Sequence, residues 1–161
     1  MTEGSAGRGC AGAGLDRALG RSVEEVFAKM IPLGLAPARS AGPAQLACRV
    51  DIRGTWEGTV RLLFTRASAE LLARSMLRLG AREPLSEEAL VDALGECVNL
   101  VAGRFKHLAL DGVPGARSSL PWVERAGAAR AGAVRCSRAW RFEGGALAAE
   151  LSVTSSGRRA G

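Results

Sequence analysis

The chain has 161 residues, of which 47% are hydrophobic and 24% charged, so we expect one folded globular domain rather than a disordered chain. No stretch contains the roughly 18 uncharged apolar residues that a membrane-spanning helix needs, and we therefore expect no membrane insertion. The formal net charge of +6 suits nucleic-acid binding, but it comes from 20 Arg and 2 Lys in a chain with 29 Ala, a skew that looks like GC-rich coding bias.

The predicted domain is shorter than the chain. Gly and Ala dominate residues 1–20, and because they bury little area we expect a flexible N-terminal segment there. The last residues, 155–161, are expected to form a second flexible segment. The domain itself then spans 21–154, where 18 basic residues stand against 14 acidic ones and the formal charge falls to +4.

The first half of the domain is predicted to be a helix followed by a β-hairpin. Ser22 fits an N-cap, and apolar residues recur at helical spacing as far as Met30, before Pro32 ends the pattern. After a loop, apolar and polar residues alternate over 48–52 and again over 60–64, with glycines between them. This alternation is typical of two half-buried strands joined by a turn.

The second half is predicted to contain two helices and a second hairpin. A serine caps each of the helices expected over 68–80 and 86–108. A short strand follows at 119–123, and strands at 134–142 and 147–153 are joined by a Gly-Gly turn. Because hairpins make antiparallel sheets, we predict an α+β fold, an antiparallel sheet of hairpins covered on one face by helices.

The cysteines and the single histidine favour neither a zinc site nor disulfides. The four cysteines are 38, 49 and 39 residues apart, without a CxxC pair, and His107 is the only histidine, so we expect no metal site. The N-terminus has no apolar signal-peptide core. We therefore expect reduced, mostly buried thiols in a cytoplasmic protein. The cysteines are Cys10, Cys48, Cys97 and Cys136.

The helix predicted over 86–108 carries an unusual polar stripe. Asp92, Glu96 and Asn99 stand at i, i+4 and i+7, which places them on one side of the helix, away from its apolar side. Gly103 continues the stripe, and a glycine there costs about 0.5–1 kcal/mol relative to alanine, which close approach of another backbone would explain. Asn99 is the only Asn in the chain. Taken alone, the stripe also fits the solvated face of an ordinary amphipathic helix.

The segment 92–106 resembles the active-site helix of the CheX/CheC/FliY family, chemotaxis phosphatases that act on phosphorylated CheY-type receivers. The family motif is an Asp or Ser, then Glu after three residues, Asn after two more, and Pro some two dozen residues later. The matching residues here are Asp92, Glu96, Asn99 and Pro121. The resemblance extends over roughly 22–154 and implies a CheC/CheX-like fold. One such helix, rather than two in a duplicated domain, is more similar to CheX than to CheC.

The resemblance implies a hydrolase that removes the phosphoryl group from a receiver's phospho-aspartate. Such a reaction needs a water held in line with the leaving oxygen, so positioning dominates. A neutral carboxamide accepts a hydrogen bond from this water without adding negative charge. Asn99 would orient the water, and Glu96 would pair with the receiver's active-site lysine. The receiver would supply Mg²⁺, and the chain would need no cofactor or metal of its own.

Other residues of the same helix are expected to contact the receiver. Gly103 would let the partner's backbone approach. Lys106 would meet an acidic receiver surface or, alternatively, complement the helix C-terminus. Asp92 is either an outer docking contact or a solvated acid. The resemblance also implies a homodimer joined through the sheets.

Two other functions stay open on the sequence alone. A non-enzymatic domain of the same fold would bind a receiver or a flagellar switch component without hydrolysis, although the intact pair of Glu96 and Asn99 argues against it. A nucleic-acid binder is suggested by the net charge. It ranks last, because the arginines are scattered and no Tyr is available for base stacking, so we expect no nucleic-acid partner.

Overall fold

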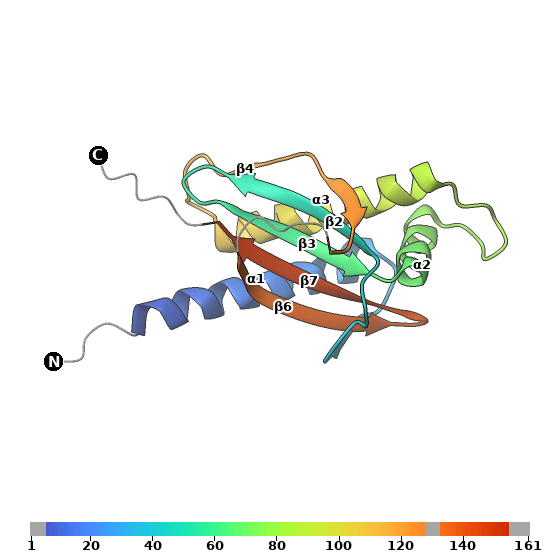
Figure 1. Cartoon of the computed structure of the whole chain (residues 1–161), viewed down its shortest axis with the longest axis horizontal. Helices are drawn as coiled ribbons and strands as arrows, with labels where there is room; N and C mark the ends of the chain where they lie inside the picture. The colour runs from blue at the N-terminus through green and yellow to red at the C-terminus, as the bar shows by residue number, and fades with distance from the viewer. Residues whose placement is uncertain (1–5, 128–132, 155–161) are drawn as a thin grey trace.

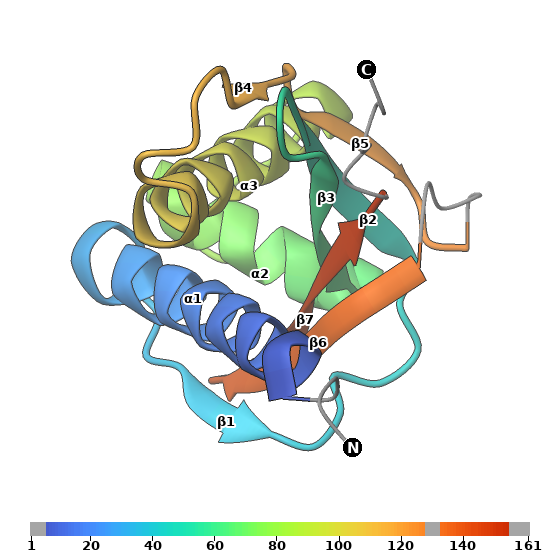
Figure 2. The ribbon, with the colours of Figure 1, turned by 90° about the vertical axis from the view of Figure 1, so that its left-hand side faces the viewer.

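The computed structural model describes residues 6–127 and 133–154, with the backbone alone for 6–12. Within these ranges three helices lie on one face of a seven-stranded antiparallel sheet (Figures 1 and 2). This arrangement confirms the predicted α+β fold. None of the described helices is both long enough and apolar enough to span a membrane. The segment 155–161 lies outside the described residues, as do residues 1–5.

The first helix begins well before its predicted start. α1 runs over Ala6–Met30, so Ser22 is not an N-cap but a buried residue inside the helix, whose hydroxyl donates a hydrogen bond to the carbonyl of Ala18. Leu19 is fully buried, so the packed domain includes part of the segment 1–20 that the sequence predicts to be flexible. The reason is tertiary, because packing of α1 against α3 and the sheet outweighs the low helix propensity of its glycines.

Both predicted hairpins are present and form the centre of the sheet. The strands follow the order β1-β6-β7-β3-β2-β4, and β5 also pairs with β2. β1 forms inside a segment predicted to be a loop, where it covers three residues of β6. Gly144 has a φ of +82° in the turn between β6 and β7, a conformation that glycine adopts without strain. The strands are β1 (Ala36–Ala38), β2 (Leu46–Arg53), β3 (Gly58–Phe64), β4 (Arg117–Ser118), β5 (Trp122–Arg125), β6 (Ala133–Phe142) and β7 (Gly145–Val153).

The second helix, α2 (Arg66–Leu77), is capped by different residues than predicted. Its N-cap is Thr65, whose hydroxyl oxygen accepts the backbone N–H of Ser68 at 3.1 Å. Ser68, the predicted cap, is buried one turn further on and accepts the backbone N–H of Ala146 at 3.0 Å. The helix ends at Arg78, in the left-handed conformation with φ 55°, rather than at Gly80.

The third helix, α3 (Glu87–Ala109), matches its prediction closely. The predicted N-cap, Ser86, accepts the backbone N–H of Ala89 at 3.1 Å. The ring of Phe105 packs against Trp56 with a centroid separation of 6.0 Å. α3 contacts both other helices and the strands β2, β3 and β5, so its apolar side is fixed over its whole length. The buried residues of the predicted apolar side are Leu90, Leu94, Cys97, Val98, Val101 and Phe105.

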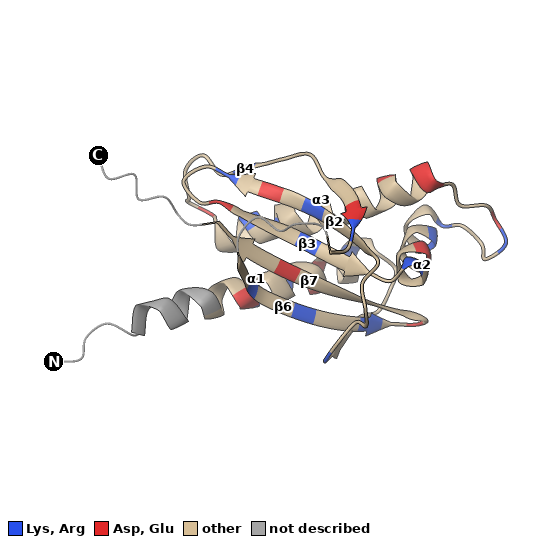
Figure 3. Ribbon diagram, in the orientation of Figure 1, with Lys and Arg blue, Asp and Glu red and all other residues tan. Residues whose placement is uncertain are grey.

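The face of the sheet opposite the helices carries interleaved charges of both signs (Figure 3). Arg61 on β3 is only 1% exposed, and its guanidinium lies 3.5 Å from the carboxylate of Glu124 and 3.4 Å from that of Glu150. Arg49 lies 4.0 Å from the centre of the Trp122 ring. Several charges of this face, which we call the outer sheet face, thus pair with one another within the chain.

Candidate functional site

The predicted polar residues lie together on the exposed side of α3. Asp92, Glu96 and Asn99 are all exposed, whereas their neighbours Gly95 and Cys97 are buried. None of the three polar side chains makes a hydrogen bond or an ion pair with any residue that the structure describes. A carboxylate and a carboxamide are therefore presented one helical turn apart, free to bind groups from outside the chain.

The described thiols have structural roles. Cys48, Cys97 and Cys136 are buried and unpaired, which confirms the prediction for these three; the side chain of Cys10 lies outside the described residues. Burial, with a smaller contribution from the Glu96 carboxylate, raises the pKa of the Cys97 thiol to about 12. Cys97 therefore stays protonated at neutral pH and packs as a small apolar residue.

Pro121, the last residue of the sequence motif, packs against α3 beside the polar stripe. A Cβ placed on Gly95 would lie 3.5 Å from Cγ of the Pro121 ring, so the ring covers the helix one residue before Glu96. The preceding turn is fixed to β2, because Ser119 accepts the backbone N–H of Asp51 at 3.0 Å and donates its own N–H to the Asp51 carbonyl at 2.8 Å. Pro121 thus packs on α3 directly before β5.

A groove of about 440 Å³ runs between α1 and α3 and includes Asn99 in its wall. Sequence reasoning missed this groove, because it depends on how two distant helices pack. Met30, predicted to continue the apolar side of α1, is 63% exposed here. Apart from its chain neighbours and the adjoining backbone of α3, no atom of the described chain would lie within 4 Å of a Cβ at Gly103, so the close approach that would explain this glycine does not come from those residues. The lining residues are Glu25, Val26, Lys29, Met30, Asn99, Leu100, Gly103, Arg104 and His107.

The charges around the groove are partly paired. Glu25 of α1 accepts hydrogen bonds from Arg104 at 2.5 Å and from Arg21 at 2.7 Å. These two bonds lower the pKa of the Glu25 carboxyl to about 2, and the bond from Arg104 has the larger effect. Glu25 is therefore ionised at neutral pH. Lys29 and Lys106 make no ion pair within the described part of the chain. This side of α3 therefore keeps two free positive charges.

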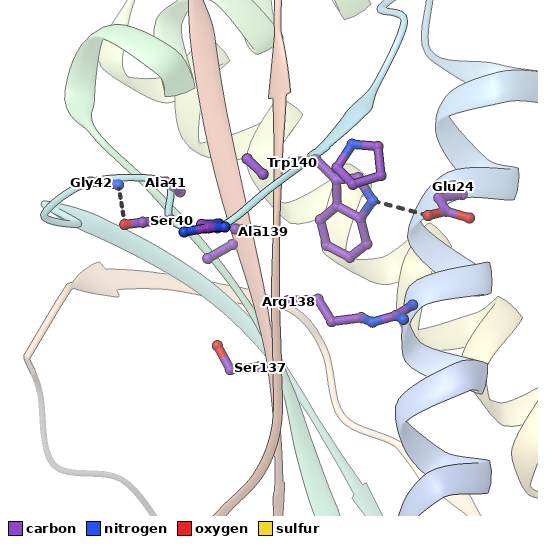
Figure 4. A pocket seen from close by; sticks show the side chains of 12 residues that line it. Glu24, Ser40, Ala41, Gly42, Ser137, Arg138, Ala139 and Trp140 are labelled. Carbon is purple, nitrogen blue, oxygen red and sulfur yellow. Dashed lines mark hydrogen bonds between the residues drawn. The ribbon is translucent and has the colours of Figure 1, made fainter.

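A second cavity, of about 470 Å³, lies at the corner where β1 meets β6. Figure 4 shows the indole of Trp140 on the α1 side of this cavity, where its N–H donates to Glu24 at 3.1 Å. None of the predicted site residues lines it. Among the residues that the structure describes, no three His, Cys, Asp or Glu side chains are grouped as metal ligands.

Comparisons with known proteins bear on this site. Residues 46–124, which include α3 and Pro121, match the family model "Chemotaxis phosphatase CheX". No curated protein sequence matches the chain. Several solved structures share its fold. The crystal structure of the chemotaxis protein CheX from Vibrio vulnificus has a TM-score of 0.72 and 19% identity, over 89% of this chain and 98% of that one.

Two further structures extend this likeness. The CheX of a CheX–CheY–BeF₃–Mg²⁺ complex from Borrelia burgdorferi has a TM-score of 0.62 and 15% identity, over 86% of this chain and 97% of that one. FliY from Thermotoga maritima has a TM-score of 0.58 and 14% identity, over 94% and 92% of the two chains. The family match and the shared fold agree with the motif on α3: the chain has the fold of CheX, and its residues 46–124 match the CheX family of chemotaxis phosphatases.

Proposed function

We propose that this protein hydrolyses the phospho-aspartate of a CheY-type receiver domain, with Glu96 and Asn99 as the residues that act on the receiver. The observation that carries the proposal is the pair itself. The two side chains are exposed, unpaired within the described chain and held one turn apart on a helix whose other side is buried throughout. A binding site built on a rigid helix can place both groups accurately on a partner.

The mechanism follows from the chemistry of an acyl phosphate. Its hydrolysis requires a water in line with the leaving oxygen, and little covalent help from the enzyme. The carbonyl oxygen of the Asn99 side chain would accept a hydrogen bond from this water and hold it in the attacking position. Because the carboxamide is neutral, it would not repel the phosphoryl oxygens. Phosphate would leave, and the receiver's aspartate would be restored.

Glu96 would fix the register of the complex by pairing with the lysine of the receiver's active site. The receiver would also hold the Mg²⁺ that neutralises the phosphoryl oxygens. A relative with this fold was crystallised with CheY, BeF₃ and Mg²⁺, which supports a receiver as partner. Asp92 stands one turn before Glu96 and is also exposed, so we assign it an outer contact to the receiver.

The test is the rate of phosphate release from phosphorylated CheY-type receiver domains, with and without this protein. We expect acceleration by the wild-type protein and a loss of about 100-fold or more in the Asn99→Ala variant, the size of effect that misplacing a reacting group produces. Glu96→Ala should weaken receiver binding. Glu88→Gln removes an exposed carboxylate two turns away on the same helix and should leave the rate unchanged.

Two results would decide against this mechanism. An Asn99→Ala variant with the wild-type rate would remove Asn99 from the reaction. A wild-type protein that binds phosphorylated receivers yet never accelerates their dephosphorylation would favour a purely binding domain, such as a component of a flagellar switch.

We further propose a homodimer that pairs through the sheet. β6 is ten residues long, but β1 covers only Ala139–Arg141 of it. Among the described residues, the edge of β6 before Ala139 has no strand partner, and an open edge of this kind can add a strand from a second copy. The mass of the protein in solution, measured by light scattering, tests the dimer directly.

A further inference from the structure

The groove between α1 and α3 is continuous with the proposed active site. Asn99 and Gly103 stand at i and i+4 on α3, so they lie one above the other, and both line the groove. Its opposite wall comes from the last two turns of α1, including Lys29 and Met30. A partner that contacts Asn99 from outside is therefore directly beside this groove.

We propose that this groove is the second half of the receiver-docking surface and accepts an apolar side chain of the receiver over Gly103. This inference rests on the proposed function and adds to it a contact that α3 alone does not provide. Met30 would form the apolar wall of the contact, and Lys29 would bind acidic groups at its edge. The C-terminal turns of α1 would thus help to select the receiver.

The properties of the groove fit such an occupant. Met30 is a flexible, polarisable side chain left 63% exposed, and Met is common on surfaces that adapt to a partner. Gly103 weakens α3, although nothing in the described chain would contact a Cβ there. A side chain from another molecule that packs against the helix backbone at Gly103 would explain why this position is a glycine.

Charge favours an acidic partner over a basic one. Arg104 is held by Glu25 at 2.5 Å, so the positive charge of Arg104 is already balanced. Lys29 has no ion-pair partner in the described chain and lies at the same groove. Its charge is therefore available to a receiver, whose phosphorylated site is acidic. A second copy of this chain would instead bring another Lys29 and the same balanced pair of Glu25 and Arg104.

The experiment fills the groove with a new side chain on α3. Gly103→Leu places a side chain where the structure has open space, and should weaken binding of a BeF₃⁻-loaded CheY-type receiver about tenfold or more, the loss typical of a strong interface position. The matched control is Gly14→Leu, another exposed glycine of a helix with nothing within 4 Å of its Cβ, for which we expect the wild-type Kd. Circular dichroism and thermal unfolding verify that both variants fold.

Two further test variants, one of them with a matched control, keep the test decisive if Gly103→Leu fails to fold. Met30→Ala should raise the Kd severalfold, whereas Leu77→Ala, which truncates an exposed apolar residue at the end of α2, should not. Lys29→Glu should weaken binding most at low salt, because the lost attraction is screened as ionic strength rises.

The outcomes separate this inference from the proposed function. If Asn99→Ala abolishes hydrolysis but Gly103→Leu and Met30→Ala bind the receiver as the wild type does, the groove is not a receiver contact and the proposed function stands. If the groove variants weaken receiver binding although no hydrolysis occurs, the docking surface stands and the phosphatase proposal fails. If Gly103→Leu changes only the oligomeric state, the occupant is a second copy and the inference is overturned.

Discussion

The outer sheet face and the polar stripe of α3 both carry charged side chains. On the sheet these side chains form ion pairs within the described chain, whereas in the stripe they do not. On the outer sheet face Arg61 of β3 is 1% exposed and its guanidinium lies within 3.5 Å of the carboxylates of Glu124 on β5 and Glu150 on β7. On α3 the side chains of Glu96 and Asn99 are exposed and have no partner in the described chain. The first arrangement contributes to the fold and leaves little for a ligand. The second contributes little to the fold and is available to a partner.

The largest expected effect on stability lies on the outer sheet face. Arg61→Ala removes the buried cation next to the carboxylates of Glu124 and Glu150, although Glu124 keeps Arg49 at 3.7 Å; removing one partner from buried ion pairs costs up to about 3–5 kcal/mol. Equilibrium unfolding in urea measures the loss. Arg53→Ala is the matched control, because Arg53 is 77% exposed and pairs with Asp51 at 3.7 Å; we expect about 1 kcal/mol or less.

Comparable losses in these two arginine variants would mean that the outer sheet face is not a structural network. Arg61→Met sharpens the result, because it keeps most of the apolar volume and removes only the charge. If Arg61→Met is as stable as the wild type, the loss in Arg61→Ala comes from packing and not from the ion pairs.

A substitution in the polar stripe should raise the free energy of unfolding instead of lowering it. Gly103→Ala should raise the free energy of unfolding by about 0.5–1 kcal/mol, because alanine is the better helix former and the added Cβ meets open space. Gly14→Ala should give a similar gain in α1. Urea unfolding measures both, and receiver binding distinguishes them, since only Gly103 lies in the proposed docking groove. A destabilised Gly103→Ala variant would contradict the open space at this position.

Local sequence patterns predicted the helices and strands that are determined by residues close together in the sequence. Strand alternation located β2, β3, β6 and β7, and the cap at Ser86 located α3 with its buried and exposed sides. The polar stripe could be identified because its residues lie within three turns of one helix. These features depend on neighbours in the sequence, which a periodic pattern reports directly.

Features that depend on tertiary contacts could not be predicted in the same way. Ser22 and Ser68 look like N-caps, but both are buried inside helices, where Ser68 binds the distant backbone of Ala146. Met30 follows the apolar spacing of α1 and is nevertheless exposed, because it lies in the wall of the groove between α1 and α3. The groove itself joins residues about 70 positions apart, and no local signal indicates such a pair.

The smallest expected effect concerns the ion pair that joins α1 to α3 at the groove. The hydrogen bonds from Arg104 and Arg21 lower the pKa of Glu25 from 4.5 to about 2. Because the folded protein binds this proton less tightly than the unfolded chain, Glu25 contributes stability that is fully present above about pH 4.5 and is lost as the pH falls towards 2. Glu25→Gln should therefore be less stable than the wild type at pH 7, and the difference should shrink at pH 3.

Urea midpoints of the two proteins at both pH values measure this change. In an Arg104→Gln background, which lacks the main hydrogen-bond donor to Glu25, the same Glu25→Gln substitution should have a smaller effect and a weaker pH dependence. A Glu25→Gln variant as stable as the wild type at both pH 7 and pH 3 would contradict the lowered pKa. The pair would then be a surface contact without energetic weight, like many exposed ion pairs, and Arg104 would be free to bind the receiver alongside Lys29.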